Sequence, residues 1–139
     1  TVISMGSGAR QGLHQRESAA IYSPAYLFDE NGLAERPVID SPADQTEIEL
    51  GSSLTIELSP DAPTDIDKVA LVALGATTHQ FDMNQRYVPL DTFISLGDTL
   101  IVPVPNRPNE LLPGWYMLYV VTEAGVPSVA PYVRIVEAP

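Results

Sequence analysis

The sequence predicts an all-β domain, an antiparallel sandwich of short strands. Thirteen prolines and nine glycines are spread along the 139 residues, and they interrupt any long helical period. Apolar and polar residues alternate over residues 54–59, as in a strand with one buried face. Segments rich in β-branched and aromatic residues recur, with turn signals between them, over about 100 residues. This spacing is typical of an antiparallel sandwich of about six or seven strands.

Residues 1–35 differ from the rest of the chain. Two apolar segments, TVISMGSG and AAIYSPAYLF, are separated by the polar loop ARQGLHQRES and followed by the strong turn sequence DENG. A lone pair of strands is marginally stable in water, so we interpret this stretch as the end of a larger structure. The chain also begins at Thr1 without an initiator methionine, and we expect a leader or a larger body of protein to precede it.

The strands of the sandwich are expected after residue 36. The alternating segment LTIELS (54–59) places three apolar residues, Leu54, Ile56 and Leu58, on one face. Further strands are predicted from their β-branched and aromatic content at KVALVAL (68–74), TLIVPV (99–104), GWYMLYVV (114–121) and YVRIV (132–136). Turns rich in proline, glycine, asparagine or aspartate are predicted between them at 59–65, 95–98, 106–114 and 123–125.

The polar run TTHQFDMNQR (77–86) is long for its position between two apolar segments, KVALVAL and YVPL. A hairpin is usually closed by about two to five residues. His79, one of two histidines in the chain, lies near the start of this run. Without further context His79 is interpreted as an exposed loop residue, because a single imidazole is not a metal site.

Composition excludes several classes of partner. Seven basic and eighteen acidic residues give a formal charge of −11, which repels nucleic acid and anionic membrane surfaces. No apolar run reaches the length of about 20 residues that spans a bilayer, and no basic start precedes an apolar stretch, so neither a membrane span nor a signal peptide is expected. The chain has no cysteine, and therefore no disulfide, thiolate metal ligand or thiol nucleophile.

Two long stretches carry a series of short motifs in a specific order. VALVALGATTHQFDMNQRYVPL (69–90) contains Thr-His, Gln-Arg and Pro-Leu pairs, and LPGWYMLYVVTEAGVPSVAPYVRI (112–135) contains P-G, Y-M-L and G-V-P-S. AIYSPAYLF (20–28) and RPVI (36–39) precede them. Together these motifs resemble the C-terminal domain of galactose oxidase and glyoxal oxidase, the copper-radical oxidases, over essentially the whole chain.

The resemblance implies a domain organisation. In that family the C-terminal domain is an immunoglobulin-like (early-set) sandwich packed against a seven-bladed kelch β-propeller. Residues 1–35 are then expected to be the C-terminal end of the propeller with a linker, and residues 36–139 the sandwich. The rest of the propeller would lie outside this chain, as its partner within the same protein.

The resemblance also implies a site. In the family a long loop of the sandwich reaches through the propeller and delivers a histidine to copper, and His79 matches that residue. Neutral imidazole suits Cu(II). Gln85 and Arg86 are expected to brace the loop, since Arg offers five donors in a rigid fork. The family's copper has two tyrosine and two histidine ligands, one tyrosine being cross-linked to a cysteine. Without cysteine, this chain would supply one ligand, His79, and would not be catalytically competent alone.

Other candidate residues favour structural interpretations. The aromatic residues of GWYMLYVV could stack on sugars, but the segment is apolar on both faces, which favours packing between sandwich and propeller. These residues are Trp115, Tyr116 and Tyr119. Tyr116 is also a candidate for the tyrosine of an immunoglobulin-type corner. The loop acids without EF-hand spacing are expected to be solvated rather than calcium ligands; they are Asp61, Asp65 and Asp67.

The complete protein is therefore expected to be a secreted or cell-surface copper-radical oxidase. It would oxidise a primary alcohol, aldehyde or carbohydrate substrate with O2 and release H2O2. The alternative is a non-catalytic sandwich module of a kelch protein that serves cell-wall architecture or glycan binding. A Cys, a Tyr and a Tyr-His pair at the family's positions upstream would favour the oxidase.

Overall fold

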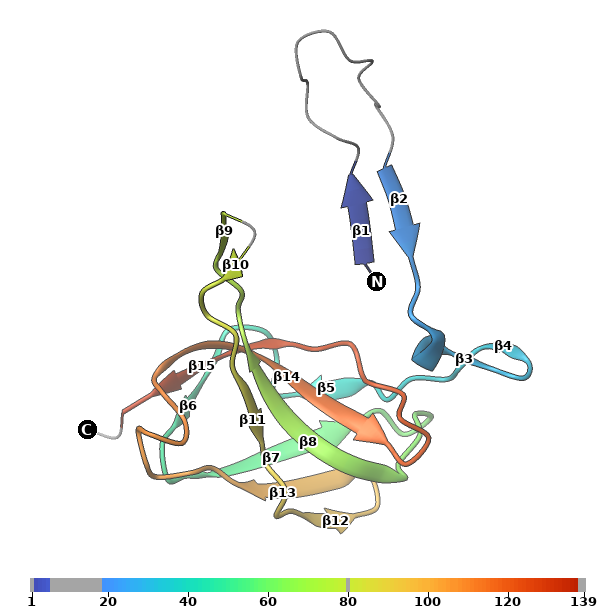
Figure 1. The fold of residues 1–139 in the computed structure, drawn as a ribbon. Helices are drawn as coiled ribbons and strands as arrows, with labels where there is room; N and C mark the ends of the chain where they lie inside the picture. Colours follow the sequence, from blue (N-terminus) through green and yellow to red (C-terminus); the bar gives the residue numbers. More distant parts are fainter. Residues whose placement is uncertain (1, 6–18, 80, 138–139) are drawn as a thin grey trace, which may run out of the picture. The chain divides into compact units, whose positions relative to one another are not determined.

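A computed structural model describes residues 2–5, 19–79 and 81–137 (Figure 1). The chain divides into two compact units, Thr1–Ala34 and Glu35–Pro139. Apart from one short 3-10 helix, η1 (Ala25–Leu27), the described residues form strands, turns and irregular backbone. The all-β prediction is confirmed.

The first unit contains two small antiparallel pairs. β1 (Val2–Met5) pairs with β2 (Ala19–Tyr22), and after η1 the strand β3 (Phe28–Asp29) pairs with β4 (Gly32–Leu33). The turn sequence DENG joins β3 and β4, and the Asn31 N–H donates to Asp29 Oδ1 at 2.7 Å. The predicted polar loop ARQGLHQRES (9–18) lies outside the described residues. The assignment of this unit to a propeller stays a prediction.

The second unit is a sandwich of two sheets (Figure 1). The five-stranded sheet has the order β11 (Tyr87–Pro89), β8 (Ile66–Ala73), β14 (Gly114–Thr122), β15 (Tyr132–Val136) and β6 (Thr46–Glu49). The four-stranded sheet has the order β12 (Ile94–Leu96), β13 (Thr99–Pro103), β7 (Ser53–Leu58) and β5 (Ile39–Ser41). The five strands predicted from the sequence are confirmed as β7, β8, β13, β14 and β15.

One strand pair departs from the antiparallel pattern. β6 runs parallel to β15, with Ile48 opposite Ile135, whereas the other strand pairs of both sheets are antiparallel. β6 lies in the five-stranded sheet, while β5 before it and β7 after it lie in the other sheet. A strand that crosses between sheets in this way is not joined to its neighbour by a hairpin, so the direction that a hairpin would impose does not apply.

The core lies between the two sheets and follows the predicted alternation. In β7 the residues Leu54, Ile56 and Leu58 are buried, and Thr55 and Glu57 are exposed. In β14 the even-numbered residues from Tyr116 to Thr122 are buried in the same way. Each fully buried Leu, Ile or Val contributes about 1.5–3 kcal/mol relative to an exposed side chain. The alternation therefore fixes which face of each sheet packs inward.

The outer face of β14 is partly exposed in this chain. Trp115 is 42% exposed, and Met117, Tyr119 and Val121 are half-buried. Within this chain the four-stranded sheet buries one face of β14. Burial of the other face against a propeller stays a prediction. The neighbouring outward side chains Tyr87 and Tyr132 are also exposed, which makes this a largely aromatic surface.

Arg36 ties the beginning of the sandwich to a distant loop. Its Nε donates to the Pro127 carbonyl at 2.7 Å, and its Nη2 donates to the Ser128 carbonyl at 2.5 Å. Ser128 is fully buried, and its Oγ accepts the Val120 N–H at 3.2 Å. The RPVI and GVPS motifs, about 90 residues apart in sequence, therefore meet through one planar guanidinium fork.

Tyr116 forms the predicted corner. Its ring is 3% exposed, and its hydroxyl donates to the Leu112 carbonyl, four residues upstream, at 2.8 Å. This is the geometry of an immunoglobulin-type tyrosine corner. Burial raises the pKa of the phenol above its ordinary value near 10.0, while the Arg86 charge lowers it in part.

Tyr116→Phe should remove this hydrogen bond with little change in packing. We expect a loss of about 1 kcal/mol in the free energy of unfolding, the usual net contribution of one such bond. The raised pKa adds a pH dependence: above pH 10 the unfolded phenol ionises before the folded one, so stability falls as pH rises, and Phe removes that contribution. Urea denaturation at pH 7 and pH 10.5 measures both effects. Tyr132→Phe, at an exposed ring, is the control, and an equal loss there would contradict the assignment.

Candidate metal-ligand arm

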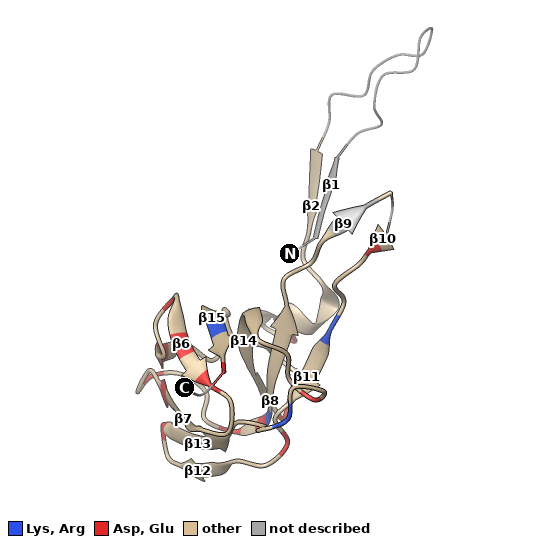
Figure 2. Ribbon diagram, turned by 90° about the vertical axis from the view of Figure 1, so that its left-hand side faces the viewer, with Lys and Arg blue, Asp and Glu red and all other residues tan. Residues whose placement is uncertain are grey.

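The polar run forms an arm that projects from the sandwich (Figures 1 and 2). We define the arm as residues 74–86, between the ends of β8 and β11. It contains a second, inner hairpin in which β9 (Thr77–Thr78) pairs with β10 (Phe81–Asp82). Of the two residues between β9 and β10, the structure describes His79. The polar run is therefore long because it forms an extension from the sandwich.

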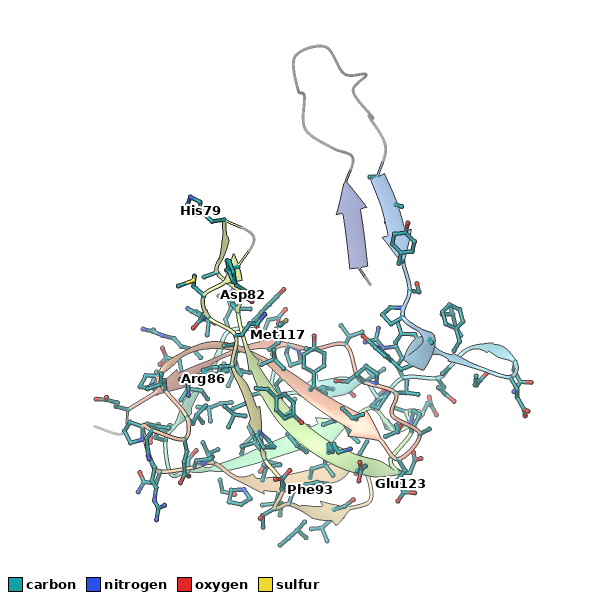
Figure 3. All side chains as sticks on the ribbon, viewed as in Figure 1. His79, Asp82, Arg86, Phe93, Met117 and Glu123 are labelled. Carbon is teal, nitrogen blue, oxygen red and sulfur yellow. The ribbon has the colours of Figure 1, made fainter. Side chains whose placement is uncertain are left out.

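His79 lies at the tip of the arm. Its side chain is exposed and points away from the sandwich in Figure 3. Its φ is 50°, in the left-handed region. Residues that close a short hairpin need positive φ, and histidine is one of the few non-glycine residues enriched there. The turn therefore holds the imidazole at the outermost point of the arm.

The root of the arm is held by side-chain hydrogen bonds. Asp82 Oδ1 accepts the Ala76 N–H at 2.8 Å and the Asn84 N–H at 3.0 Å. Asn84 Nδ2 donates to the Leu74 carbonyl at 2.8 Å, and the Met83 N–H donates to the Ala76 carbonyl at 3.1 Å. Sequence reasoning missed Asp82 and Asn84. The available signal was residue type, because Asp and Asn side chains often bond to nearby backbone groups in turns.

Gln85 and Arg86 lie where the arm joins β11. Gln85 is exposed and Arg86 is half-buried. The Arg86 carbonyl accepts the Ala73 N–H at 2.9 Å, and its guanidinium is near enough to the Tyr116 phenol to lower that pKa. Arg86 therefore sits at the root of the arm (Figure 3). The bracing role expected for both residues stays a prediction.

The described part of the chain does not assemble a metal site of its own. No group of three or more His, Cys, Asp or Glu side chains within it could hold a metal ion. His79 can offer one imidazole nitrogen, a donor that Cu(II) favours, and the remaining ligands would have to come from elsewhere.

Of the acidic residues considered as calcium ligands, Asp67 pairs with the Lys68 Nζ at 2.7 Å on the surface.

Apolar side chains flank the histidine. Phe81 is 71% exposed and Met83 is 75% exposed, both on the returning strand of the arm. At the end of the sandwich from which the arm rises, Tyr87 is 58% and Trp115 42% exposed. Exposed apolar groups gathered in one region are typical of surfaces that contact another domain or protein.

No helix in the described ranges is long and apolar enough to cross a membrane.

Comparison with known proteins confirms the resemblance inferred from the motifs. The family model of the galactose oxidase-like early set domain matches residues 36–135. A galactose oxidase of Gibberella zeae is 36% identical over 120 residues, which cover 86% of this chain and 17% of that protein. The aldehyde oxidase GLOX of Vitis pseudoreticulata is 31% identical over 121 residues, covering 83% of this chain and 22% of that protein.

A solved structure agrees with these relatives. A fungal alcohol oxidase of the AA5 family, in complex with copper, aligns with a TM-score of 0.70 at 36% identity. The alignment covers 81% of this chain and 23% of that one. The chain thus spans about a fifth of the length of each of these proteins.

The 139-residue chain alone should bind Cu(II) weakly, because a single imidazole on an exposed turn provides one of the several ligands that copper requires. Titration against a competing chelator measures the affinity. Detectable H2O2 production by the purified chain with copper and galactose, glyoxal or glycerol would contradict the assignment of His79 as its contribution to a site.

Proposed function

Because the chain belongs to the galactose oxidase-like early set domain family, we propose that it is the C-terminal domain of a copper-radical oxidase and donates His79 to the enzyme's copper. The observation that carries this proposal is the position of His79. It lies at the tip of an arm whose two strands are joined near the root by side-chain hydrogen bonds, and the Leu74 N–H at the start of the arm donates to the Trp115 carbonyl of the sandwich. An exposed imidazole held beyond its own domain suits a ligand that completes a site on another domain.

The residues of this chain would contribute one copper ligand and the orientation of that ligand. The His79 imidazole would supply a neutral nitrogen ligand, and the left-handed turn would aim it outward. When bound, the copper with its radical cofactor would support oxidation of a primary alcohol or aldehyde by O2, with release of H2O2. No group of three or more His, Cys, Asp or Glu side chains in the described part of the chain could hold a metal ion, so the proposed copper site would draw its other ligands from the rest of the protein.

The partner of the arm is proposed to be a kelch propeller in the same protein, with residues 1–35 as its C-terminal end and linker. The exposed Phe81 and Met83 support such a contact, since burying them would remove apolar surface from water. The relatives matched here include a galactose oxidase, an aldehyde oxidase and an alcohol oxidase, which supports a carbohydrate, alcohol or aldehyde as substrate. We propose that the complete protein acts outside the cell or at its surface.

His79→Asn in the complete protein tests the proposal. Asn accepts the left-handed φ of the turn, so the hairpin and the free energy of unfolding should be preserved to within about 0.5 kcal/mol. Copper affinity should fall by about 100-fold or more, since even indirect supports of metal ligands cost 10–100-fold. Copper content, H2O2 production and thermal melting are measured together, with His79→Ala as a second variant.

Wild-type copper content and activity in His79→Asn would contradict the proposal. The arm would then have a structural role without binding copper. A non-catalytic module that serves wall architecture or glycan binding would become the better interpretation. Loss of copper with an unchanged melting curve would support the ligand assignment directly.

Gln85→Ala and Arg86→Ala should give smaller losses of copper content than His79→Asn. Both residues lie at the root of the arm, and their removal would loosen the arm without removing a ligand. The same copper and melting measurements apply. If either variant equals His79→Asn in its effect while the fold is intact, the residue has a more direct part in the site than bracing.

A further inference from the structure

The arm contains a stretch that is not held by a regular strand ladder. The β8–β11 ladder reaches Val72 opposite Tyr87, and one further bond joins the Ala73 N–H to the Arg86 carbonyl. The inner ladder begins at Thr77 opposite Asp82. Residues 74–76 and 83–85 lie between the two ladders. The direction in which the inner hairpin leaves the sandwich is therefore set within this stretch.

The side chains of Asp82 and Asn84 span this stretch. One oxygen of Asp82, Oδ1, accepts N–H groups from both strands of the arm, those of Ala76 and Asn84. The Asn84 amide crosses in the other direction to the Leu74 carbonyl. The bonds to Asp82 are charge-assisted, which makes them shorter and stronger than bonds between neutral groups.

Gly75 leaves room for the Asp82 carboxylate. A Cβ atom at Gly75 would lie 2.9 Å from Asp82 Oδ2, closer than real Cβ contacts allow. The backbone of Gly75 does not adopt a positive φ, so space rather than conformation explains the glycine. Asp82 Oδ2 thus packs against Gly75 while Oδ1 binds the two amides, and the carboxylate is fixed on both sides.

We propose that Asp82, supported by Asn84 and Gly75, is a positioning residue that sets the direction of the arm and thereby the position of His79 at copper. This inference rests on the proposed function. The inner hairpin consists of two residue pairs, and Phe81 on it and Met83 just after it are exposed, so the side chains described there form no apolar core that would hold it in place. A metal ligand must be held to within about 0.5 Å. The Asp82 bonds join the two strands of the arm at its root, and they would supply this precision in place of apolar packing.

Four variants of the complete protein test this inference. Asp82→Ala removes both bonds, and Asp82→Asn keeps the Oδ1 acceptor. Gly75→Ala displaces the carboxylate without removing any hydrogen-bonding group. Asp44→Ala is the matched control, because Asp44 Oδ1 accepts one backbone N–H, that of Tyr132, at 2.7 Å on the sandwich away from the arm. Copper affinity by chelator competition, the Cu(II) EPR spectrum and hydrogen exchange at Ala76 and Asn84 are measured for each.

Asp82→Ala and Gly75→Ala should lower copper affinity by about tenfold or more, within the 10–100-fold range seen for supports of metal ligands, and should change the EPR spectrum. The amides of Ala76 and Asn84 should exchange faster. Asp82→Asn should restore most of the affinity and the wild-type spectrum, and Asp44→Ala should retain both. The double variant Gly75→Ala with Asp82→Ala should be no worse than Asp82→Ala, because the carboxylate that Gly75→Ala displaces is already absent.

Wild-type copper affinity and spectrum in Asp82→Ala, with faster exchange at Ala76 and Asn84, would overturn the positioning role. An equal loss in Asp44→Ala would overturn it too, since the effect would then be general destabilisation. If Asp82→Ala does not fold, Gly75→Ala and Asn84→Ala decide in its place by the same readouts. His79→Asn separates the two proposals. If His79→Asn loses copper and Asp82→Ala retains it, this inference alone is overturned. Normal copper binding in His79→Asn overturns both.

Discussion

The pairing of β8 with β14 is the interaction on which the rest of the molecule depends. Val69 and Leu71 of β8 and Leu118 and Val120 of β14 are almost fully buried between the sheets. Packed interiors of this kind deform little. β8 runs directly into the arm, and the Leu74 N–H still donates to the Trp115 carbonyl at 3.3 Å where the arm begins. The core therefore provides a fixed base for a residue that lies well outside it.

Beyond that base the means of stabilisation changes. The arm buries little apolar surface, and its order comes from hydrogen bonds to the side chains of Asp82 and Asn84. Functional groups are often carried in this way on loops that a rigid scaffold positions. The exposed Phe81 and Met83 add a second consequence, since an arm that enters an apolar channel would gain from burying them. Polar bonds would then orient the arm before docking, and apolar contact would hold it afterwards.

The sequence predicted the elements whose signal is local. LTIELS alternates clearly and became β7, and the Tyr116 corner followed from its place in GWYMLYVV. β12 is only Ile94–Leu96, too short to show alternation, and the parallel β6 pairing depends on residues about 90 positions apart. TTHQFD lacks both an alternating pattern and a glycine turn, so the inner hairpin was missed. The family motif indicated His79, but the bonds of Asp82 depend on a geometry that no spacing rule encodes.

Charge in this chain has two separate uses. The three ion pairs found among the described residues, Lys68–Asp67, Arg107–Glu110 and Arg134–Glu47, are all exposed, and such pairs contribute little to stability. Figure 2 shows acidic residues on β6 and in loops of the sandwich. Arg36 and Asp82 instead bind backbone groups, the carbonyls of Pro127 and Ser128 and the amides of Ala76 and Asn84. Backbone partners are less mobile than long side chains, so a charge bound to them fixes geometry. Arg36 fixes where the sandwich begins, and Asp82 fixes where its arm leaves.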